Sequence, residues 1–190
     1  MKVNAFLYGE NMYLRALSEQ DIFNNYKYWF NDDEVCRGNS HHRFPKNEES
    51  LKKYIVESNI EINRIVLAII EKNEEIHIGN VSLQNINYFN RSAEFAVIIG
   101  EKEYWGKGYG KEATALIINH GFNTLNLNRI YCGTYSNNVG MQQIAFSLGF
   151  KQEGLRREAD YKEGKYIDVI EYGLLKKEWE KIRRKDYEIL

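Results

Sequence analysis

Apolar and polar positions change their period several times along the chain, and each period predicts an element. Residues 12–16 alternate as in a β-strand, and Ser18 then offers an N-cap followed by acidic residues, which predicts a helix. The apolar face of this helix consists of Ile22, Tyr26, Trp29 and Phe30. The polar stretch 31–46 predicts a loop, and Asn47 caps a second helix. Its inner face, at helical spacing, consists of Leu51, Tyr54, Ile55 and Ser58.

The middle of the chain predicts a meander of three strands. The runs 64–71 and 76–84 are rich in β-branched residues, and the polar residues between them are typical of a hairpin. A third run covers 92–100, and a glycine-rich turn at 105–110 follows it. The helix after this turn runs to about residue 125 because apolar residues recur at helical spacing. That stripe consists of Ala113, Leu116, Ile117 and His120.

The last third predicts a strand at 129–135, a helix at 138–148, a long hairpin turning near Glu163 and Gly164, and a closing helix at 176–185. Strands that alternate with helices predict an α/β (α+β) fold. We expect a mixed, mainly antiparallel central sheet of about seven strands flanked by helices on both faces. The chain has a single proline and neither a linker-like stretch nor a repeat, so we expect residues 1–190 to form one domain.

Composition narrows the function classes. Of the 190 residues, 43% are hydrophobic and 28% charged, and 26 basic against 27 acidic residues leave a net charge of −1. This balance argues against nucleic acid as the main partner. No apolar run approaches the roughly 20 residues that span a bilayer, and the N-terminus lacks a signal-peptide core, so we expect a cytoplasmic protein without a membrane partner. Cys36 and Cys132 should be reduced, and no His, Cys and Glu spacing indicates a metal.

The glycine-rich turn is the segment most informative about chemistry. Glycines alternate in Trp105-Gly106-Lys107-Gly108-Tyr109-Gly110, so backbone N–H groups can approach a ligand closely, and the following helix adds its positive end. This geometry is typical of phosphate binding. The spacing fits neither the P-loop nor the dinucleotide fingerprint. A turn that only packs a helix on the sheet is the alternative.

Three ordered motifs resemble the GNAT superfamily of acetyl-CoA-dependent N-acetyltransferases. The turn 105–110 is similar to the family's Arg/Gln-x-x-Gly-x-Gly/Ala signature, with Trp105 at the Arg/Gln position. The segment from Asn138 to Leu148-Gly149-Phe150 looks like its second signature. The segments 154–158 and 164–168 resemble the branch that contains ribosomal-protein alanine, polyamine and nucleotide-amino-sugar acetyltransferases. The resemblance covers about residues 8–176 and implies a GNAT-like fold.

The resemblance implies binding residues for acetyl-CoA, the co-substrate. The turn would hold the pyrophosphate, backbone N–H groups near Val97 would polarise the thioester carbonyl, and Asn138 would bind the pantetheine arm. The residues assigned to acetyl-CoA are Val97, Ile98, Ile99, Trp105, Gly106, Lys107, Gly108, Tyr109, Gly110, Lys111 and Asn138.

Glu94 is the candidate general base, because its position resembles that of the family's catalytic glutamate. Alternation places Glu94, Ala96 and Ile98 on one face of the strand. The alternative is a structural glutamate paired with Arg91 or a lysine. The tyrosine that protonates the leaving thiolate in many relatives is replaced by Ala145, so water or another hydroxyl would take that role. The candidate hydroxyls are Tyr135, Ser136 and Tyr161.

The acceptor is expected to be the primary amine of a nucleotide-linked amino sugar. The segment after the first helix resembles that group of enzymes and offers cations for a diphosphate. The residues assigned to the acceptor are Trp29, Asn31, Arg37, His41, His42, Arg43 and Tyr161. Trp29 as a core residue and Asn31 as a helix cap are the alternative. A protein N-terminus is the second acceptor class, a polyamine is the third, and a non-catalytic acyl-CoA-binding module stays open. We expect a monomer or a homodimer.

Overall fold

The computed structural model describes residues 4–186, with side chains described through residue 182. Its strands are β1 (Leu7–Tyr8), β2 (Met12–Ala16), β3 (Ile65–Glu71), β4 (His77–Asn87), β5 (Ser92–Ile99), β6 (Arg129–Tyr135), β7 (Lys151–Lys162) and β8 (Lys165–Leu175). Its helices are η1 (Glu19–Phe23), α1 (Tyr26–Trp29), α2 (Glu48–Ile60), η2 (Lys102–Tyr104), α3 (Tyr109–Asn123), α4 (Val139–Ser147) and α5 (Lys176–Asp186).

All eight described strands form one sheet in the order β1-β2-β3-β4-β5-β6-β8-β7. Every neighbouring pair is antiparallel except β5 and β6. The predicted mixed, mainly antiparallel sheet is therefore confirmed. The short strand β1 is the eighth strand, and it was not predicted. It pairs only two residues with β2, which is too little sequence to show a period.

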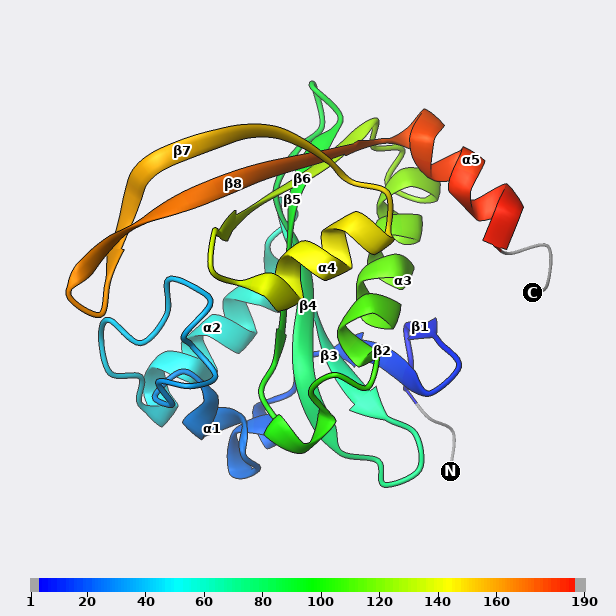
Figure 1. Ribbon diagram of the computed structural model, residues 1–190. Coiled ribbons are helices and arrows are strands. Elements are labelled where there is room, and N and C mark those ends of the chain that lie inside the picture. The colour runs from blue at the N-terminus through cyan, green and yellow to red at the C-terminus, as the bar shows by residue number, and fades with distance from the viewer. Residues whose placement is uncertain (1–3, 187–190) are drawn as a thin grey trace.

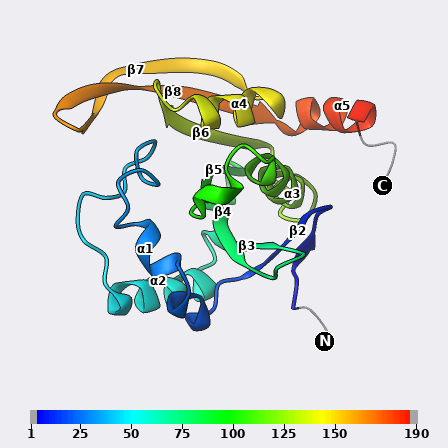
Figure 2. The same cartoon turned by 60° about the horizontal axis from the view of Figure 1, so that its bottom comes forward.

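Helices cover both faces of the sheet, as predicted (Figures 1 and 2). Helices α3 and α4 lie on one side and α1 and α2 on the other. Strand β5 shows why two cores form, because its residues alternate between them. Phe95, Val97 and Ile99 pack into the core under α3, whereas Ile98 packs into the core under α2.

The first predicted helix is broken into two short pieces. Ser18 caps η1 in a capping box with Asp21, as its position predicts. The backbone of Asn24 is extended, with φ −94° and ψ −165°, so the helix stops and α1 starts again at Tyr26. The expected apolar residues are nonetheless buried, because both pieces press the same side onto the sheet. Those residues are Ile22, Tyr26, Trp29 and Phe30.

The hairpin β7–β8 arches across the molecule to the loop that precedes α2 (Figure 1). Its tip fastens that loop through Lys162, whose ammonium donates to the backbone carbonyls of Cys36, Asn39 (2.7 Å) and His41 (3.2 Å). Three carbonyl acceptors around one ammonium replace much of its hydration. Residues 36–41 are thereby held against the sheet although they form no regular element.

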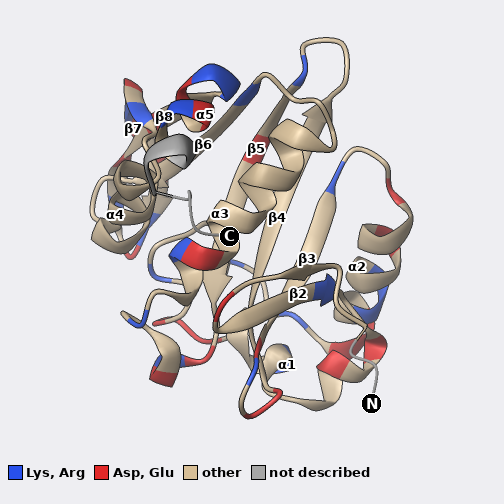
Figure 3. Cartoon of the chain, turned by 90° about the vertical axis from the view of Figure 1, so that its right-hand side faces the viewer, with Lys and Arg blue, Asp and Glu red and all other residues tan. Residues whose placement is uncertain are grey.

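Charges of both signs are interspersed on the side of the molecule drawn in Figure 3. In the described part of the chain, no helix combines the length and apolar character needed to cross a membrane. Among the same residues, no group of three His, Cys, Asp or Glu side chains is arranged to hold a metal ion. The single-domain organisation and the cytoplasmic location stay predictions.

Candidate active site

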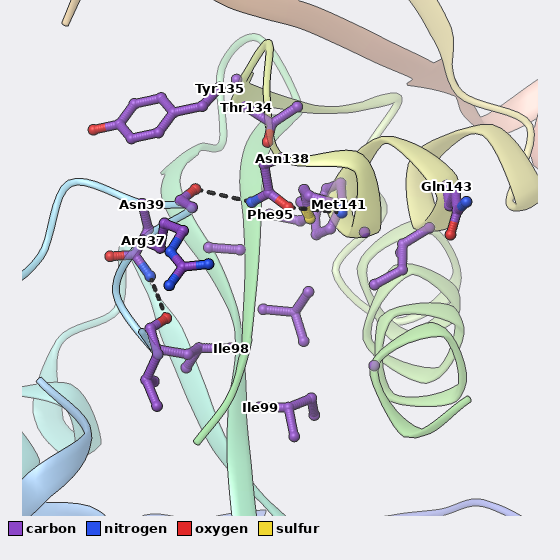
Figure 4. Close-up of a pocket in the computed structure, with 18 of the residues that line it drawn as sticks. Arg37, Asn39, Phe95, Ile98, Ile99, Thr134, Tyr135, Asn138, Met141 and Gln143 are labelled. Atoms are coloured by element: carbon purple, nitrogen blue, oxygen red, sulfur yellow. Dashed lines mark hydrogen bonds between the residues drawn. The ribbon is translucent and has the colours of Figure 1, made fainter. Parts of the chain in front are cut away.

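Strands β5 and β6 separate after a short common stretch. They pair only where Ser92–Glu94 meets Arg129–Tyr131. Beyond Glu94 the strands diverge and open a cleft of about 950 Å³. Its walls come from β5, the glycine turn, the end of β6, α4 and the loop around residue 37. Figure 4 shows labelled residues of β5, β6, α4 and this loop around the cleft. The divergence therefore creates a site that is open to a ligand in the middle of the sheet.

Inside this cleft, one edge of β5 has no neighbouring strand. The N–H of Gly100 donates to Ile78 O of β4 at 2.9 Å. Since backbone groups alternate between the two edges of a strand, the N–H groups of Val97 and Phe95 point to the opposite edge. No strand occupies that edge after Glu94. An extended ligand can hydrogen-bond there as a strand would.

The glycine turn at the end of the cleft is shaped for a ligand rather than for packing. Gly106 and Gly108 have φ of 72° and 91°, and a Cβ added to either would meet no atom within 4 Å. Gly108 is also the N-cap of α3, so the unpaired N–H groups of the first helical turn face open space. These features favour the phosphate-binding interpretation over a turn that only packs the helix.

Gly110 has a different role from the two glycines before it. A Cβ there would lie 3.2 Å from Ile144 Cδ1 of α4 and 3.7 Å from Ile99 Cγ1. It therefore lets α3 pack closely against α4 and β5. Trp105, at the position of the family's Arg or Gln, donates its indole N–H to Ile99 O at 2.8 Å. The indole fastens the turn to the end of β5.

Glu94 lies at the point where the two strands part, and it lines the cleft. Its Oε2 accepts a hydrogen bond from Asn85 Nδ2 at 3.0 Å. Arg91, the partner expected for a structural glutamate, donates instead to Asn126 through Nε (2.7 Å) and Nη2 (2.6 Å). Among the described residues Glu94 forms no ion pair, which leaves its carboxylate available as a base.

The residue at the position of the missing tyrosine, Ala145, does not reach the cleft. Ala145 is fully buried in the core between α4 and the sheet. Tyr135 lines the cleft, but its hydroxyl donates to Asp160 Oδ2 at 2.7 Å, and burial with that bond raises its pKa to about 12. The neighbouring Thr134 also lines the cleft, and its hydroxyl is buried without a hydrogen-bond partner among the described residues. Thr134 was not singled out from the sequence.

A second, smaller chamber of about 280 Å³ lies on the other face of β5. It joins the cleft at residues that line both cavities, namely Asn39, His41, Gln84, Ala96, Val97 and Ile98. Asn80, Ser82 and Gln84 of β4 form one wall, with Ser50 and Tyr54 of α2 opposite. No Asp or Glu is among the residues that line it.

The polar wall of β4 is unusual because it faces a core. Asn80 and Ser82 are 6% and 4% exposed, beside the apolar Val66, Ala68 and Ile70 of the neighbouring strand. Buried polar groups cost stability unless they are paired. Asn80 Oδ1 lies 2.9 Å from His77 Nε2, and Ser82 accepts from Gln84 at 2.8 Å, so a ligand would meet the polar atoms that these contacts leave over. Sequence reasoning missed this wall. Its signal was three polar residues at alternate positions within an otherwise apolar strand.

The structure brings together most of the residues assigned to acetyl-CoA. All of them line the cleft except Lys107, whose ammonium lies 5.4 Å from the centre of the Tyr104 ring. Asn138 caps α4 by accepting from Met141 N (3.1 Å) and donates to Gly38 O (2.9 Å), as Figure 4 shows. Its amide therefore fastens the loop over the cleft, and a bond to pantetheine would compete with that contact.

The residues assigned to the acceptor divide into two groups. Arg37 and His41 line the cleft, and Figure 4 shows the Arg37 guanidinium turned away from its loop toward β5. Partial loss of hydration and the nearby Lys46 and Lys162 lower the pKa of His41, so its ring does not supply the expected positive charge at pH 7. For Arg37, no ion-pair partner is found in the described part of the chain.

None of the remaining acceptor residues lines the cleft, and most of them contact other parts of the protein. Trp29 is 3% exposed and donates to Glu101 at 2.9 Å, which agrees with the core alternative. The Asn31 side chain donates to Lys46 O and accepts from Lys46 N, so it holds the two ends of its loop together and does not cap a helix. Arg43 pairs with Asp160. His42 is exposed, and the exposed Tyr161 contacts the ring of Tyr166.

Residues 11–151 match the model of the acetyltransferase (GNAT) domain. The chain belongs to the GNAT acetyltransferase family. The uncharacterized N-acetyltransferase p20 of Bacillus licheniformis is 31% identical over 175 residues, covering 91% of this chain and 97% of p20. The spermidine N(1)-acetyltransferase of Vibrio cholerae is 33% identical over 165 residues, covering 82% of this chain and 88% of that relative. The structure of the Vibrio cholerae spermidine N-acetyltransferase with CoA and spermine superimposes with a TM-score of 0.81 at 25% identity. The match covers 89% of this chain and 98% of that structure.

Membership of the GNAT family fixes the reaction class of this chain. It is an acetyl-CoA-dependent N-acetyltransferase. The GNAT cleft between β5 and β6 has the features that this co-substrate requires, namely an unpaired strand edge for an extended arm and open backbone N–H groups for phosphates.

Proposed function

We propose that this enzyme transfers the acetyl group of acetyl-CoA to the primary amine of a nucleotide-linked amino sugar. The observation that carries the proposal is the chamber behind β5, whose walls offer hydrogen-bonding groups and one lysine, Lys46, but no carboxylate among the lining residues. Asn80, Ser82 and Gln84 suit the hydroxyls of a sugar. A polyamine, which carries several positive charges, would have to leave water there without a counter-charge.

Acetyl-CoA would enter from the glycine turn. Its pyrophosphate would lie over Gly106 and Gly108, where the backbone is open and the N-terminus of α3 is positive. Lys111 lines the same end of the cleft and adds a positive charge. The pantetheine arm would follow the free edge of β5, and the N–H of Val97 would polarise the thioester carbonyl. The thioester then lies beside Val97, at the junction of cleft and chamber, with Glu94 three residues before it on β5.

Direct transfer within a ternary complex accounts for the groups at that junction. Glu94, through a water molecule, takes a proton from the ammonium of the sugar. The freed amine attacks the carbonyl carbon and a C–N bond forms. As the tetrahedral intermediate collapses, the C–S bond breaks and the nitrogen gives its second proton to water. Coenzyme A leaves as a thiolate, whose ordinary thiol pKa of about 8.5 makes it a better leaving group than an alkoxide.

The buried hydroxyl of Thr134 is the best placed side chain to donate a hydrogen bond to the departing sulfur. Tyr135 is the weaker candidate, because its proton is directed to Asp160 and its pKa is raised to about 12. Tyr161 does not line the cleft. Final protonation of the thiolate then comes from water, as the loss of the tyrosine at Ala145 requires.

A polyamine is the second candidate acceptor, and the relatives favour it. The Vibrio cholerae relative is named for spermidine, and it covers most of this chain. A mixture of charges at the mouth of the cleft could accommodate a cation, since Glu34 and Asp160 line it together with Arg37 and Arg156. Those two carboxylates are already paired, however, with Lys102 and Arg43.

An acceptor panel tests the proposal. Release of coenzyme A is measured with UDP- and dTDP-linked amino sugars, glucosamine, spermidine, and peptides that start with alanine or serine. The expected result is the highest kcat/KM for a sugar nucleotide. Higher kcat/KM for spermidine would transfer the assignment to a polyamine, and higher kcat/KM for a peptide would transfer it to a protein N-terminus. Binding of acetyl-CoA without turnover of any amine would indicate a non-catalytic module.

A further inference from the structure

A line of buried polar groups runs from the back of the molecule to the acceptor chamber. Arg15 donates to Asp21 at 2.9 Å, and Asp21 Oδ1 lies 3.5 Å from Nδ1 of His77. The other ring nitrogen, Nε2, lies 2.9 Å from Oδ1 of Asn80. Asp21 and His77 are 1% and 4% exposed, so water does not compete for these contacts. Only Asn80, at the end of the line, reaches the chamber.

The contacts of His77 determine which way the Asn80 amide faces. Nε2 of His77 also lies 2.9 Å from the backbone oxygen of Gly79. A carbonyl oxygen only accepts, so Nε2 must carry the hydrogen. The same N–H faces Oδ1 of Asn80, since a rotated amide would bring two donors together. The amide nitrogen is therefore the atom of Asn80 that is left to face other groups.

Asn80 keeps a donor for the chamber even after its local contacts are counted. An amide nitrogen has two N–H groups. Neither of them has a protein acceptor within hydrogen-bond distance among the described residues, and the buried hydroxyl of Tyr26 also has no partner there. Asn80 belongs to the same wall as Ser82 and Gln84, whose side chains hydrogen-bond each other at 2.8 Å.

We propose that His77, whose ring is held between Tyr26 and Trp29, is a positioning residue that aims the Asn80 amide as a hydrogen-bond donor at an oxygen next to the reacting amine of the acceptor. The inference rests on the proposed function, because an amino sugar carries such an oxygen and a polyamine does not. Asn80 is thereby a specificity-determining residue. An acceptor without the oxygen leaves the buried N–H unpaired, which is the situation that gives strong discrimination between substrates.

The test compares two amines that differ by one hydroxyl, trans-2-aminocyclohexanol and cyclohexylamine. Wild-type enzyme should prefer the amino alcohol in kcat/KM by about tenfold or more. The variant His77→Phe keeps the ring that contacts Tyr26 and Trp29, at 5.3 and 4.9 Å between centroids, but it removes the N–H. It should lose this preference while KM for acetyl-CoA is unchanged. His77→Gln, which restores an N–H at that place, should regain it.

Asn80→Asp is the second variant, because it keeps the shape of the side chain and removes both donors. It should lose the same preference. Nitrogen NMR of the wild-type His77 ring should show the hydrogen on Nε2, and a hydrogen on Nδ1 alone would overturn the inference. Wild-type preference retained in both His77→Phe and Asn80→Asp would overturn it without affecting the proposed function. Wild-type enzyme that acetylates neither cyclic amine would contradict the acceptor class and this role of Asn80 together.

Discussion

The two halves of the site are built in different ways. The acetyl-CoA half uses main-chain groups from two continuous pieces, the turn 105–110 and the free edge of β5. The acceptor half uses side chains from β4, α2, the loop 34–41 and the tip of the β7–β8 hairpin. A main-chain site depends on the positions of glycines, and these positions can be read from a short sequence motif. A side-chain site depends on how distant segments pack, so it can change its ligand without changing the fold.

The two halves also differ in what holds them. The glycine turn is anchored locally, through the Trp105 indole and the close approach of Gly110 to Ile144. The acceptor loop is anchored by distant side chains, since Lys162 and Asn138 bind its carbonyls. Substitutions in the first half should therefore affect acetyl-CoA alone. Substitutions in the second half should affect the acceptor, often together with stability.

The largest expected effect comes from Gly108→Glu. Its φ of 91° disfavours any side chain, and a carboxylate would lie in the open space assigned to the pyrophosphate. We expect the Kd for acetyl-CoA, measured by calorimetry, to rise by about 10³, because the carboxylate both repels the pyrophosphate and occupies its space. Unchanged affinity would show that phosphate binds elsewhere.

Gly164→Glu is the matched control for this variant. Gly164 has φ of 80° in the β7–β8 turn, and an added Cβ there also meets nothing within 4 Å. The control introduces the same residue into a similar backbone conformation outside the cleft. It should lower the melting temperature and leave the Kd for acetyl-CoA unchanged. Equal loss of affinity in both variants would assign the effect to instability.

Glu94→Gln tests the junction of the two halves and should reduce kcat by about 10² at neutral pH, the usual scale for a lost general base. The loss should shrink as the pH approaches the pKa of the amine, because the free amine then needs no base. The Kd for acetyl-CoA should stay the same. Glu103→Gln removes the same charge from an exposed position and should leave kcat unchanged. A Glu94→Gln variant as fast as wild type would make Glu94 structural.

Asp21→Asn should reveal that the acceptor half depends on buried charge. Hydrogen bonds from the Arg15 guanidinium and from the backbone N–H of Ser18 outweigh burial and hold the pKa of Asp21 below its ordinary value. A depressed carboxylate pKa stabilises the fold above about pH 4, and this contribution disappears as the pH falls further. We expect a loss of about 2 kcal/mol at pH 7 that narrows toward pH 2 in thermal unfolding. Asp33→Asn, at an exposed position, should leave the stability unchanged at both pH values. A loss of stability in Asp21→Asn that does not depend on pH would contradict a charged Asp21 in the folded protein.

The same contrast explains what the sequence could predict. The core-forming strands and the glycine turn were predictable because period and glycine spacing are local properties. The chamber was not predictable, because the burial of Asn80 and Ser82 is evident only when β4 is known to face a core. Arg43 and Arg37 look alike in sequence, yet Asp160, more than a hundred residues away, pairs with Arg43 alone. Long-range partners of this kind leave no pattern in one sequence.

Arg37→Ala is expected to have the smallest effect and the most specific one. Arg37 lines the cleft without an ion pair in the described part of the chain, so its guanidinium is available for a diphosphate. Its exposure limits the loss to about 1 kcal/mol, or roughly fivefold in KM for the sugar nucleotide, with kcat and KM for glucosamine unchanged. Arg43→Ala should instead affect both acceptors alike, because it releases Asp160 and loosens the loop. A selective rise in KM for the sugar nucleotide in Arg43→Ala, and none in Arg37→Ala, would reverse the two roles.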